Sequence, residues 1–311
     1  MTPVITVVGS FAVGMTIRTP QIPIFGQTIL GSDFDMGPGG KGSNQAVATA
    51  RLGADSALVA YVGQDALARI ATDMYMAEGV NAAHVQPIAS HPTGVGFIIL
   101  NTEGNNFIIL DMGANTALDA AAVDAAADRI AVSHVVMTVL EIPTAAAHRA
   151  MELGRIAGAR TILNPAPARA LHPSIFQHVD VVIPNESELR ILLGLPPDDP
   201  TPSRELAHRL RRLGVGTVVV TLGRDGALVL SDRHEIAIPA LPVAVVDTTG
   251  AGDAFCAGFA VALGEGRDIV EAARYAVVCG SFACTKLGVV PSLGRRHDID
   301  TLVKDKGKGQ S

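Results

Sequence analysis

Residues 134–163 read HVVMTVLEIPTAAAHRAMELGRIAGARTIL. The apolar run His134–Met137 predicts a short strand, Thr144–Gly158 predicts a helix, and Thr161–Leu163 predicts a second strand. Near-continuous apolar strands separated by a helix are typical of a parallel sheet whose two faces are both covered. This stretch therefore predicts an α/β fold with right-handed crossovers.

The same alternation extends along the chain. Further strands are expected at Val4–Val8, Ala57–Tyr61, Val179–Ile183 and Thr217–Thr221, and further helices at Ser43–Leu52, Ala66–Met76, Asp119–Arg129, Glu186–Leu193 and Arg204–Leu213. A β pair follows at Ala227–Leu230 and Glu235–Ile238, and then two long helices at Gly250–Leu263 and Ile269–Thr285. We expect one domain, residues 1–311, built on a doubly wound, mostly parallel sheet flanked by helices.

Two segments depart from this alternation, at approximately residues 15–36 and 93–111. The first contains Pro20, Pro23 and Gly26 before an alternating stretch, Thr28–Phe34. The second predicts strands Gly96–Leu100 and Asn106–Leu110 around a turn at Thr102–Asn105. These strands are expected to project from the main sheet as a small β lid. Because its edges need covering, a homodimer formed through the lid is expected.

Composition restricts the classes of protein. The chain has 311 residues, of which 48% are hydrophobic and 17% charged, with a net charge of −6. These values argue against disorder and against a nucleic-acid partner. The chain also lacks a long uncharged apolar run, which argues against a membrane partner. Cys256, Cys279 and Cys284 form no CxxC pair, and the N-terminus has no secretory signal pattern, so we expect a cytoplasmic protein. The end at 304–311 is expected to be frayed.

A first glycine-rich turn, Gly37–Gln45, leads into a helix. It formally matches GxGxxG, but that fingerprint should close the first strand of a βαβ unit, and here the first strand ends at Gly9. It is not a Walker A loop either, because Lys41 is followed by glycine. Flexible backbone and one cation at a helix start suit hydroxyls or an anion, although the glycines could serve close packing alone.

A second turn, DTTGAGDAF at Asp247–Phe255, follows the strand-like Val243–Val246. Successive amides of Gly250, Ala251 and Gly252 at a helix N-terminus could hold the charge of a transferring phosphoryl group. Asp253 is either a residue favoured there by the helix dipole or a base that takes the proton of an attacking hydroxyl. The residues alone leave both interpretations open.

Five ordered motifs carry a family resemblance: Gly39–Asn44, Asn164–Arg169, Pro184–Glu188, Thr221–Gly226 and Asp247–Asp253. Over about Val4 to Ser292 the chain resembles the ribokinase family of carbohydrate kinases, within the phosphofructokinase-B-like superfamily. The resemblance implies transfer of the γ-phosphoryl of ATP to a primary hydroxyl of a small sugar, with Mg²⁺, on a doubly wound α/β fold with a β lid.

The resemblance also implies roles for individual residues. Asp253 would be the base, and Gly250, Ala251 and Gly252 would form the anion hole. The sugar would be faced by Gly40, Lys41, Asn44, Glu141 and Asp253. The nucleotide side would comprise Asn185, Glu188, Thr221, Gly223, Gly226 and Gly252, with Glu188 acting indirectly on Mg²⁺. An activating K⁺ would be held by Asp247 and Thr249, with backbone near Ala283, Gly288 and Ser292.

Each role has a structural alternative. Asn185 and Glu186 could cap the following helix, with Glu188 on its solvated side. Glu141 could be a loop carboxylate, and Gly223 and Gly226 could only form a hairpin turn.

The first strand departs from the family pattern. Ala12 and Gly14 stand where ribokinases have Asn and Asp side chains that hold sugar hydroxyls. Ribose is the default acceptor, and the alternatives are a nucleoside, deoxyribose or another sugar derivative. Two other classes remain: a catalytically silent sugar-binding protein, and a nicotinamide-dependent oxidoreductase using Gly37–Gly42, which the position of that turn disfavours.

Overall fold

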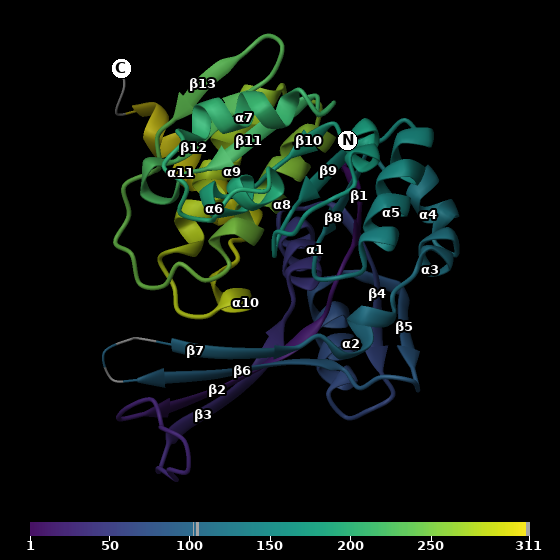
Figure 1. Ribbon diagram of the computed structural model, residues 1–311. Coiled ribbons are helices and arrows are strands. Elements are labelled where there is room, and N and C mark those ends of the chain that lie inside the picture. Colours follow the sequence, from purple (N-terminus) through teal and green to yellow (C-terminus); the bar gives the residue numbers. More distant parts are fainter. Residues whose placement is uncertain (102, 104–105, 309–311) are drawn as a thin grey trace.

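A computed structural model of the chain describes residues 1–101, 103 and 106–308, with the backbone alone described at 106 and 305–308. The expected turn at Thr102–Asn105 therefore lies almost wholly outside the described residues. Figure 1 shows a helix-covered sheet with a smaller sheet beside it.

The larger sheet has nine strands among the described residues. Their spatial order is β13 (Glu235–Ile238), β12 (Ala227–Leu230), β11 (Thr217–Thr221), β10 (Val181–Val182), β9 (Arg160–Asn164), β8 (Val135–Val139), β1 (Val4–Val8), β4 (Asp55–Gly63) and β5 (Asn81–Ile88). In this spatial order, every neighbouring pair from β11 through to β5 is parallel. Strands β12 and β13 are added antiparallel at the β11 edge. The doubly wound, mostly parallel sheet expected from the sequence is confirmed.

Helices cover both faces of this sheet, because both faces of its strands are apolar. Val7 belongs to the core on one face and its neighbour Val8 to the core on the other, and both are fully buried. The first face carries α1 (Lys41–Arg51), α2 (Ala68–Glu78), α8 (Ala251–Gly264), α9 (Ile269–Ala283) and α11 (Arg296–Lys308). The second carries α3 (Ala120–Asp124), α4 (Ala127–Ala131), α5 (Thr144–Ile156), α6 (Glu186–Leu192) and α7 (Ser203–Arg211).

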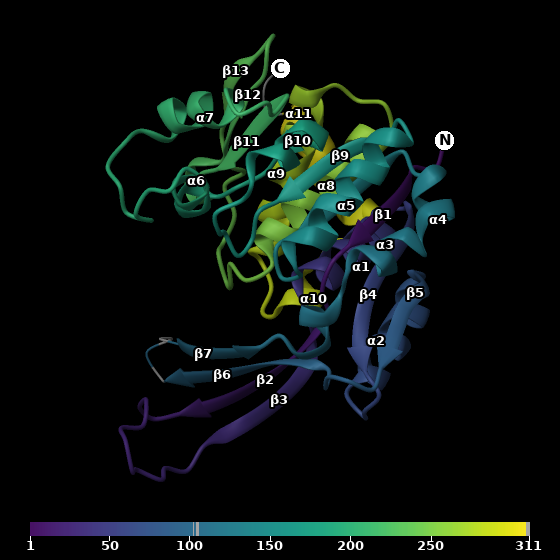
Figure 2. The same ribbon diagram turned by 45° about the vertical axis from the view of Figure 1, so that its right-hand side comes forward.

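The smaller sheet forms the lid. It contains β3 (Ser32–Gly39), β2 (Ala12–Thr19), β6 (Gly94–Asn101) and β7 (Asn106–Asp111), in that order. The antiparallel pairs β2–β3 and β6–β7 are joined by the parallel pair β2–β6, so the lid is one mixed sheet. Figures 1 and 2 show it projecting away from the helix-covered sheet.

The structure corrects three local predictions. Strand β5 was not expected, because its exposed edge position and Pro87 leave little apolar alternation. The helix predicted at Asp119–Arg129 is divided into α3 and α4. Val243–Val246 is not a strand, and the amide of Val246 donates to the carbonyl of Cys284 instead of to a strand neighbour.

Helix α11 extends to Lys308, and residues 309–311 lie outside the described residues. The frayed end expected at 304–311 stays a prediction. Within the part of the chain that is described, no helix is both long enough and apolar enough to cross a membrane.

Candidate active site

Asp253 lies in the first turn of α8 and is almost completely buried, at 6% exposure. Two side chains of α1 donate hydrogen bonds to its carboxylate. Asn44 Nδ2 lies 2.8 Å from Asp253 Oδ2, and Gln45 Nε2 lies 3.0 Å from Asp253 Oδ1. The two glycine-rich turns therefore meet at this carboxylate, although they are far apart in the sequence.

Lys41 and Glu141 complete the acidic and basic groups of this region. The backbone amide of Lys41, the first residue of α1, donates to Glu141 Oε2 at 2.8 Å, and the Ser10 hydroxyl donates to the same oxygen. Glu141 follows β8 and Ser10 follows β1, so neighbouring strands of the main sheet bring these groups to the start of α1. Glu141 is thus an ordered acceptor for two donors and not a free loop carboxylate.

The glycines of the first turn also allow close packing. A Cβ at Gly42 would lie 2.4 Å from the amide nitrogen of Ser10, and a Cβ at Gly40 would lie 2.8 Å from Cα of Phe11. The packing role that the sequence left open is therefore real at both positions. It also brings the start of β2 against the start of α1.

Charge coupling ties Lys41, Asp253 and Glu188 together. Burial raises the pKa of Asp253, and the nearby Lys41 charge and the amides of Asn44 and Gln45 only partly oppose this. Burial opposes the charge of Lys41, but Asp253, Glu141 and Glu188 outweigh it and raise the pKa of Lys41. Burial likewise raises the pKa of Glu188. The pKa values of Asp253, Lys41 and Glu188 are all raised, and Lys41 and each of the two carboxyl groups contribute to each other's shifts.

The N-terminus of α8 provides exposed backbone amides. Gly250 precedes the helix with φ of 82°, and a Cβ there would lie 2.8 Å from Val289 Cγ1, so only glycine fits. Among the described residues, the amides of Gly250 and Gly252 have no hydrogen-bond acceptor, whereas the Ala251 amide donates to Thr248 O at 3.2 Å. Two of the three predicted amides are therefore free to bind an anion.

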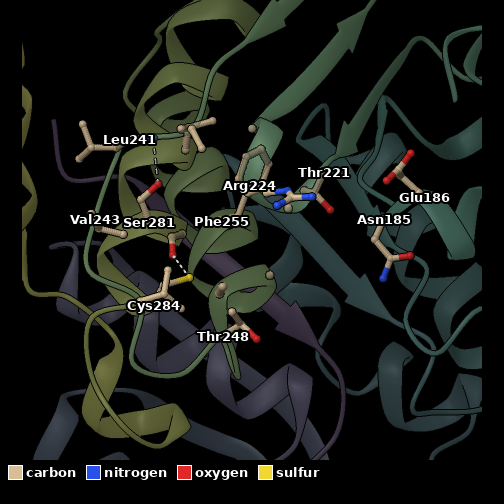
Figure 3. A pocket seen from close by; sticks show the side chains of 18 of the residues that line it. Asn185, Glu186, Thr221, Arg224, Leu241, Val243, Thr248, Phe255, Ser281 and Cys284 are labelled. Atoms are coloured by element: carbon tan, nitrogen blue, oxygen red, sulfur yellow. Dashed lines mark hydrogen bonds between the residues drawn. The ribbon is translucent and has the colours of Figure 1, made fainter.

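A cavity of about 950 Å³ opens beside this turn (Figure 3). Gly252 and Ala251 line it, together with predicted nucleotide-side residues: Asn185, Thr221, Gly223 and Gly226. One wall is apolar, with Leu241, Val243 and Phe255. The sequence did not predict this wall or Arg224, because isolated apolar residues in a loop resemble any buried loop. Asp253, Lys41, Asn44 and Glu141 do not line the cavity.

Asn185 and Glu188 form a capping box at the start of α6. Asn185 Oδ1 accepts from the Glu188 amide and Glu188 Oε2 accepts from the Asn185 amide, both at 2.8 Å. The capping alternative is therefore correct for Asn185. Glu188 is not simply a solvated residue, because its charge couples to Lys41 and Asp253.

Gly223 and Gly226 make the turn between the antiparallel strands β11 and β12, as the hairpin alternative predicted. Both also line the cavity. Thr221 ends β11, and its amide donates to Pro184 O at 2.9 Å, which sets it beside the start of α6.

The five residues assigned to a potassium site are only partly connected. Asp247 Oδ1 accepts from the amide and hydroxyl of Thr249, and Asp247 Oδ2 accepts from the Gly288 amide at 3.0 Å. Burial acts to raise the pKa of Asp247, but these hydrogen bonds outweigh it and lower that pKa. Ala283 is fully buried in α9, and the Ser292 hydroxyl donates to Val289 O. The expected part of the backbone near Ala283 and Ser292 in holding an ion stays a prediction.

A family profile described as pfkB family carbohydrate kinase matches residues 3–294. The chain belongs to the pfkB family of carbohydrate kinases. The chain is 33% identical to the ribokinase of Haemophilus influenzae, over 94% of this kinase and 96% of that enzyme. It is also 35% identical to the deoxyribokinase of Salmonella typhi, over 93% of this kinase and 94% of that enzyme.

A solved structure agrees with this assignment. The Arabidopsis thaliana ribokinase complexed with ribose and ATP superimposes on the kinase with a TM-score of 0.91 at 30% identity, covering 98% of this chain and 99% of that one. The chain is therefore an ATP-dependent carbohydrate kinase that phosphorylates an alcohol group. The oxidoreductase and the catalytically silent alternatives are set aside.

Proposed function

We propose that this kinase phosphorylates a pentose at its primary hydroxyl, with Asp253 as the base. One observation carries the proposal. Gly252 lines the large cavity, while the next residue, Asp253, is outside its lining and accepts a hydrogen bond from Asn44. A nucleotide in the cavity and a sugar beside Asn44 and Lys41 would therefore meet at the same helix N-terminus.

The step follows from this arrangement. The acceptor oxygen forms a bond to the γ-phosphorus as its proton passes to the Asp253 carboxylate, and the bond from the γ-phosphorus to the β,γ-bridging oxygen breaks to release ADP. The amides of Gly250 and Gly252 stabilise the charge on the transferring group. Lys41, Asn44 and Glu141 would orient the sugar by charge and hydrogen bonds. Asp253 then loses its proton to solvent.

Two cations are part of the proposal. Mg²⁺ would neutralise phosphate charge near Glu188. A carboxylate oxygen is a ligand that Mg²⁺ prefers, and among the described residues Glu188 Oε1 accepts no hydrogen bond, whereas Oε2 accepts one from the Asn185 amide. K⁺ would bind by Asp247, Thr249 and Gly288, with backbone near Ala283 and Ser292. The ionised Asp247 carboxylate is the anionic oxygen ligand such a site needs.

Ribose is the first acceptor to test, because ribokinases are similar to the chain over nearly its whole length. Deoxyribose is the second acceptor to test. It has one hydroxyl fewer than ribose, and the lid around Ala12 and Gly14 lacks the polar side chains that would hold sugar hydroxyls. Ala12 and Gly14 pair with Gly39 and Gly37 on β3 and with Gly94 and Gly96 on β6. This patch offers a sugar no polar side chain, and a Cβ at Gly37 would have no atom within 4 Å.

The lid also supports the proposal of a homodimer. Its strand β7 exposes a run of large apolar side chains, with Phe107, Ile108, Ile109 and Leu110 each at least 50% exposed. Paired lids would cover these residues and the strand edges. A cytoplasmic location fits the three free cysteines and the need for ATP.

A coupled assay of ADP formation tests the function. The enzyme is given ATP and Mg²⁺ with ribose, 2-deoxyribose, a ketose or a nucleoside, and the kcat/KM values are compared. We expect the highest value with a pentose. Pentose-independent ATP turnover, or a nucleoside as the best acceptor, would overturn the proposal.

A further inference from the structure

Gln45 is a fully buried polar side chain outside the set of residues assigned above. It lies on α1 with 0% exposure, and its Nε2 donates two hydrogen bonds. One reaches Asp253 Oδ1 and the other reaches Asn164 Oδ1, each at 3.0 Å. Asn164 ends β9, and its Nδ2 donates to the backbone carbonyl of Ile183 at 2.9 Å. The chain of bonds thus joins β9 and the residue after β10 to the first turn of α8.

The direction of these bonds is fixed by their anchor. A backbone carbonyl only accepts, so the group of Asn164 that faces Ile183 must be its NH₂. Asn164 Oδ1 then faces Gln45. Because this oxygen only accepts, Gln45 must donate to it from its own NH₂ group. The second hydrogen of that NH₂ is directed at Asp253. The network therefore presents a donor, and not an acceptor, to the carboxylate.

This arrangement leaves one group unsatisfied. Gln45 Oε1 is buried without a hydrogen-bond partner among the described residues. A buried acceptor without a partner is unfavourable, and an apolar side chain of similar length would avoid it. A role in packing alone does not account for the choice of glutamine at this position, whereas a donor aimed at Asp253 does.

We propose that Gln45, held by Asn164, is a positioning residue for phosphoryl transfer. With Gln45 on Oδ1 and Asn44 on Oδ2, the Asp253 carboxylate is held at both oxygens, and the two donors favour its charged form against the effect of burial. Gln45 acts only through Asp253, and the inference rests on the proposed role of Asp253 as the base. Fixing a base in its reactive orientation raises kcat more than it affects the binding of either substrate.

The test compares Gln45→Met with a control on the same helix. Thr49 is also fully buried on α1, but its hydroxyl contacts Ala46 O and Ser56 and does not contact Asp253. Gln45→Met is expected to lower kcat by about 10- to 100-fold with the KM for ATP within about twofold of wild type. Thr49→Val is expected to keep kcat within about twofold, even if both variants lower the melting temperature.

The pH profile separates positioning from general destabilisation. Loss of a donor to the ionised carboxylate should move the acidic limb of the kcat profile to higher pH in Gln45→Met, and leave it in place in Thr49→Val. An unchanged limb, or equal kcat losses per folded molecule in both variants, would overturn the proposal.

Two further variants keep the outcome interpretable. If Gln45→Met does not fold, Asn164→Ala releases the Gln45 amide from its anchor and should shift the limb in the same direction by less. An unshifted limb in Asn164→Ala then counts against the proposal. Asp253→Asn is assayed in parallel, because full activity there would reject the role of Asp253 as base and not the Gln45 contact alone.

Discussion

Asn44 Nδ2 and Asp253 Oδ2 lie 2.8 Å apart although 209 positions separate the two residues. Asn44 belongs to the first glycine-rich turn and Asp253 to the second. Their contact joins the first turns of α1 and α8, so the proposed sugar side and phosphoryl side of the kinase share one carboxylate. Asn44 Oδ1 is buried without a hydrogen-bond partner among the described residues.

Asp253→Asn tests the base. The amide keeps the size of the carboxylate but cannot take a proton, so kcat is expected to fall by at least about 10³-fold. The KM for ATP should stay within about twofold, because Asp253 does not line the cavity. Steady-state kinetics measure kcat and the KM for ATP, and a thermal melt of the same preparation shows that the variant is folded. A variant with wild-type kcat would remove Asp253 from the mechanism.

Ala12→Asn with Gly14→Asp tests the departure on the lid. A Cβ at Gly14 would lie 3.7 Å from Gly37 O, which is an ordinary van der Waals contact, so a side chain can start at this position without a clash. If the open patch is the cause of weak ribose contacts, the double variant should lower the KM for ribose by about 10-fold through charge-assisted hydrogen bonds. The KM for ATP serves as the internal control. An unchanged or higher KM for ribose would show that side chains at positions 12 and 14 of the lid do not hydrogen-bond to the sugar hydroxyls.

Asp247→Asn tests the cation site. We expect the wild-type enzyme to be faster in K⁺ than in Na⁺ at equal ionic strength, and the variant to lose that difference because an anionic oxygen ligand is gone. Initial rates in the two chlorides, with choline chloride as a reference, decide the matter. Equal wild-type rates in all three salts would contradict a site at Asp247.

The fold was predictable because burial on both faces leaves a simple signature. In β1, β8 and β11 successive residues are buried against opposite helical layers, so apolar runs mark the strands. The same reasoning failed at Val243–Val246, whose β-branched residues have no neighbouring strand. Valines 245 and 246 are at least 60% exposed. Strand propensity is decided by tertiary partners, which a local pattern does not contain.

Some residues of the candidate site could also be predicted from the sequence, and others could not. Glycines and charges with unusual local requirements, such as Gly250 and Asp253, could be found in the sequence. Gln45 could not, because a glutamine in a helix normally faces water. Only its partners reveal its role, and Asn164 and Asp253 lie 119 and 208 positions away.

Gly226→Ala and Gly223→Ala form a matched pair at the β11–β12 turn. Both glycines have positive φ, of 94° and 56°, which L residues rarely adopt. Gly226 also has ψ of −120°, outside the left-handed helical region, so its backbone strains an alanine more than the left-handed region does. A Cβ at Gly226 would in addition lie 2.0 Å from Ile238 O, whereas one at Gly223 would have no atom within 4 Å. Urea denaturation should therefore show a loss of about 3 kcal/mol or more for Gly226→Ala and about 1 kcal/mol for Gly223→Ala. Equal losses would mean that backbone conformation, and not the clash, dominates.

Glu78→Gln tests the pH dependence of stability. Glu78 receives two hydrogen bonds from Arg51, to Oε1 at 2.7 Å and to Oε2 at 2.9 Å, and its side chain is 12% exposed. Arg51 also donates to the carbonyls of Val290 and Leu293, so the pair anchors α10 (Val289–Ser292) to α1. The hydrogen bonds from Arg51 hold the pKa of Glu78 below its ordinary value of 4.5.

A carboxyl whose pKa is lower in the folded state binds fewer protons there than in the unfolded chain. Its contribution to stability is therefore complete above pH 4.5 and is lost as the pH falls through the lowered pKa of the folded protein. At pH 7 the variant should lose about 1–3 kcal/mol of unfolding free energy. The gap to wild type should narrow as the pH is lowered below that ordinary value.

Glu152→Gln is the matched control. Glu152 also pairs with an arginine, Arg149, which lowers its pKa, but its side chain is 39% exposed. Water screens such a pair, so this variant should lose much less stability at pH 7 than Glu78→Gln. Urea denaturation of the three proteins at neutral and acidic pH makes the comparison. A gap between wild type and Glu78→Gln that stays constant with pH would assign the effect to packing around Arg51 and not to the charge of Glu78.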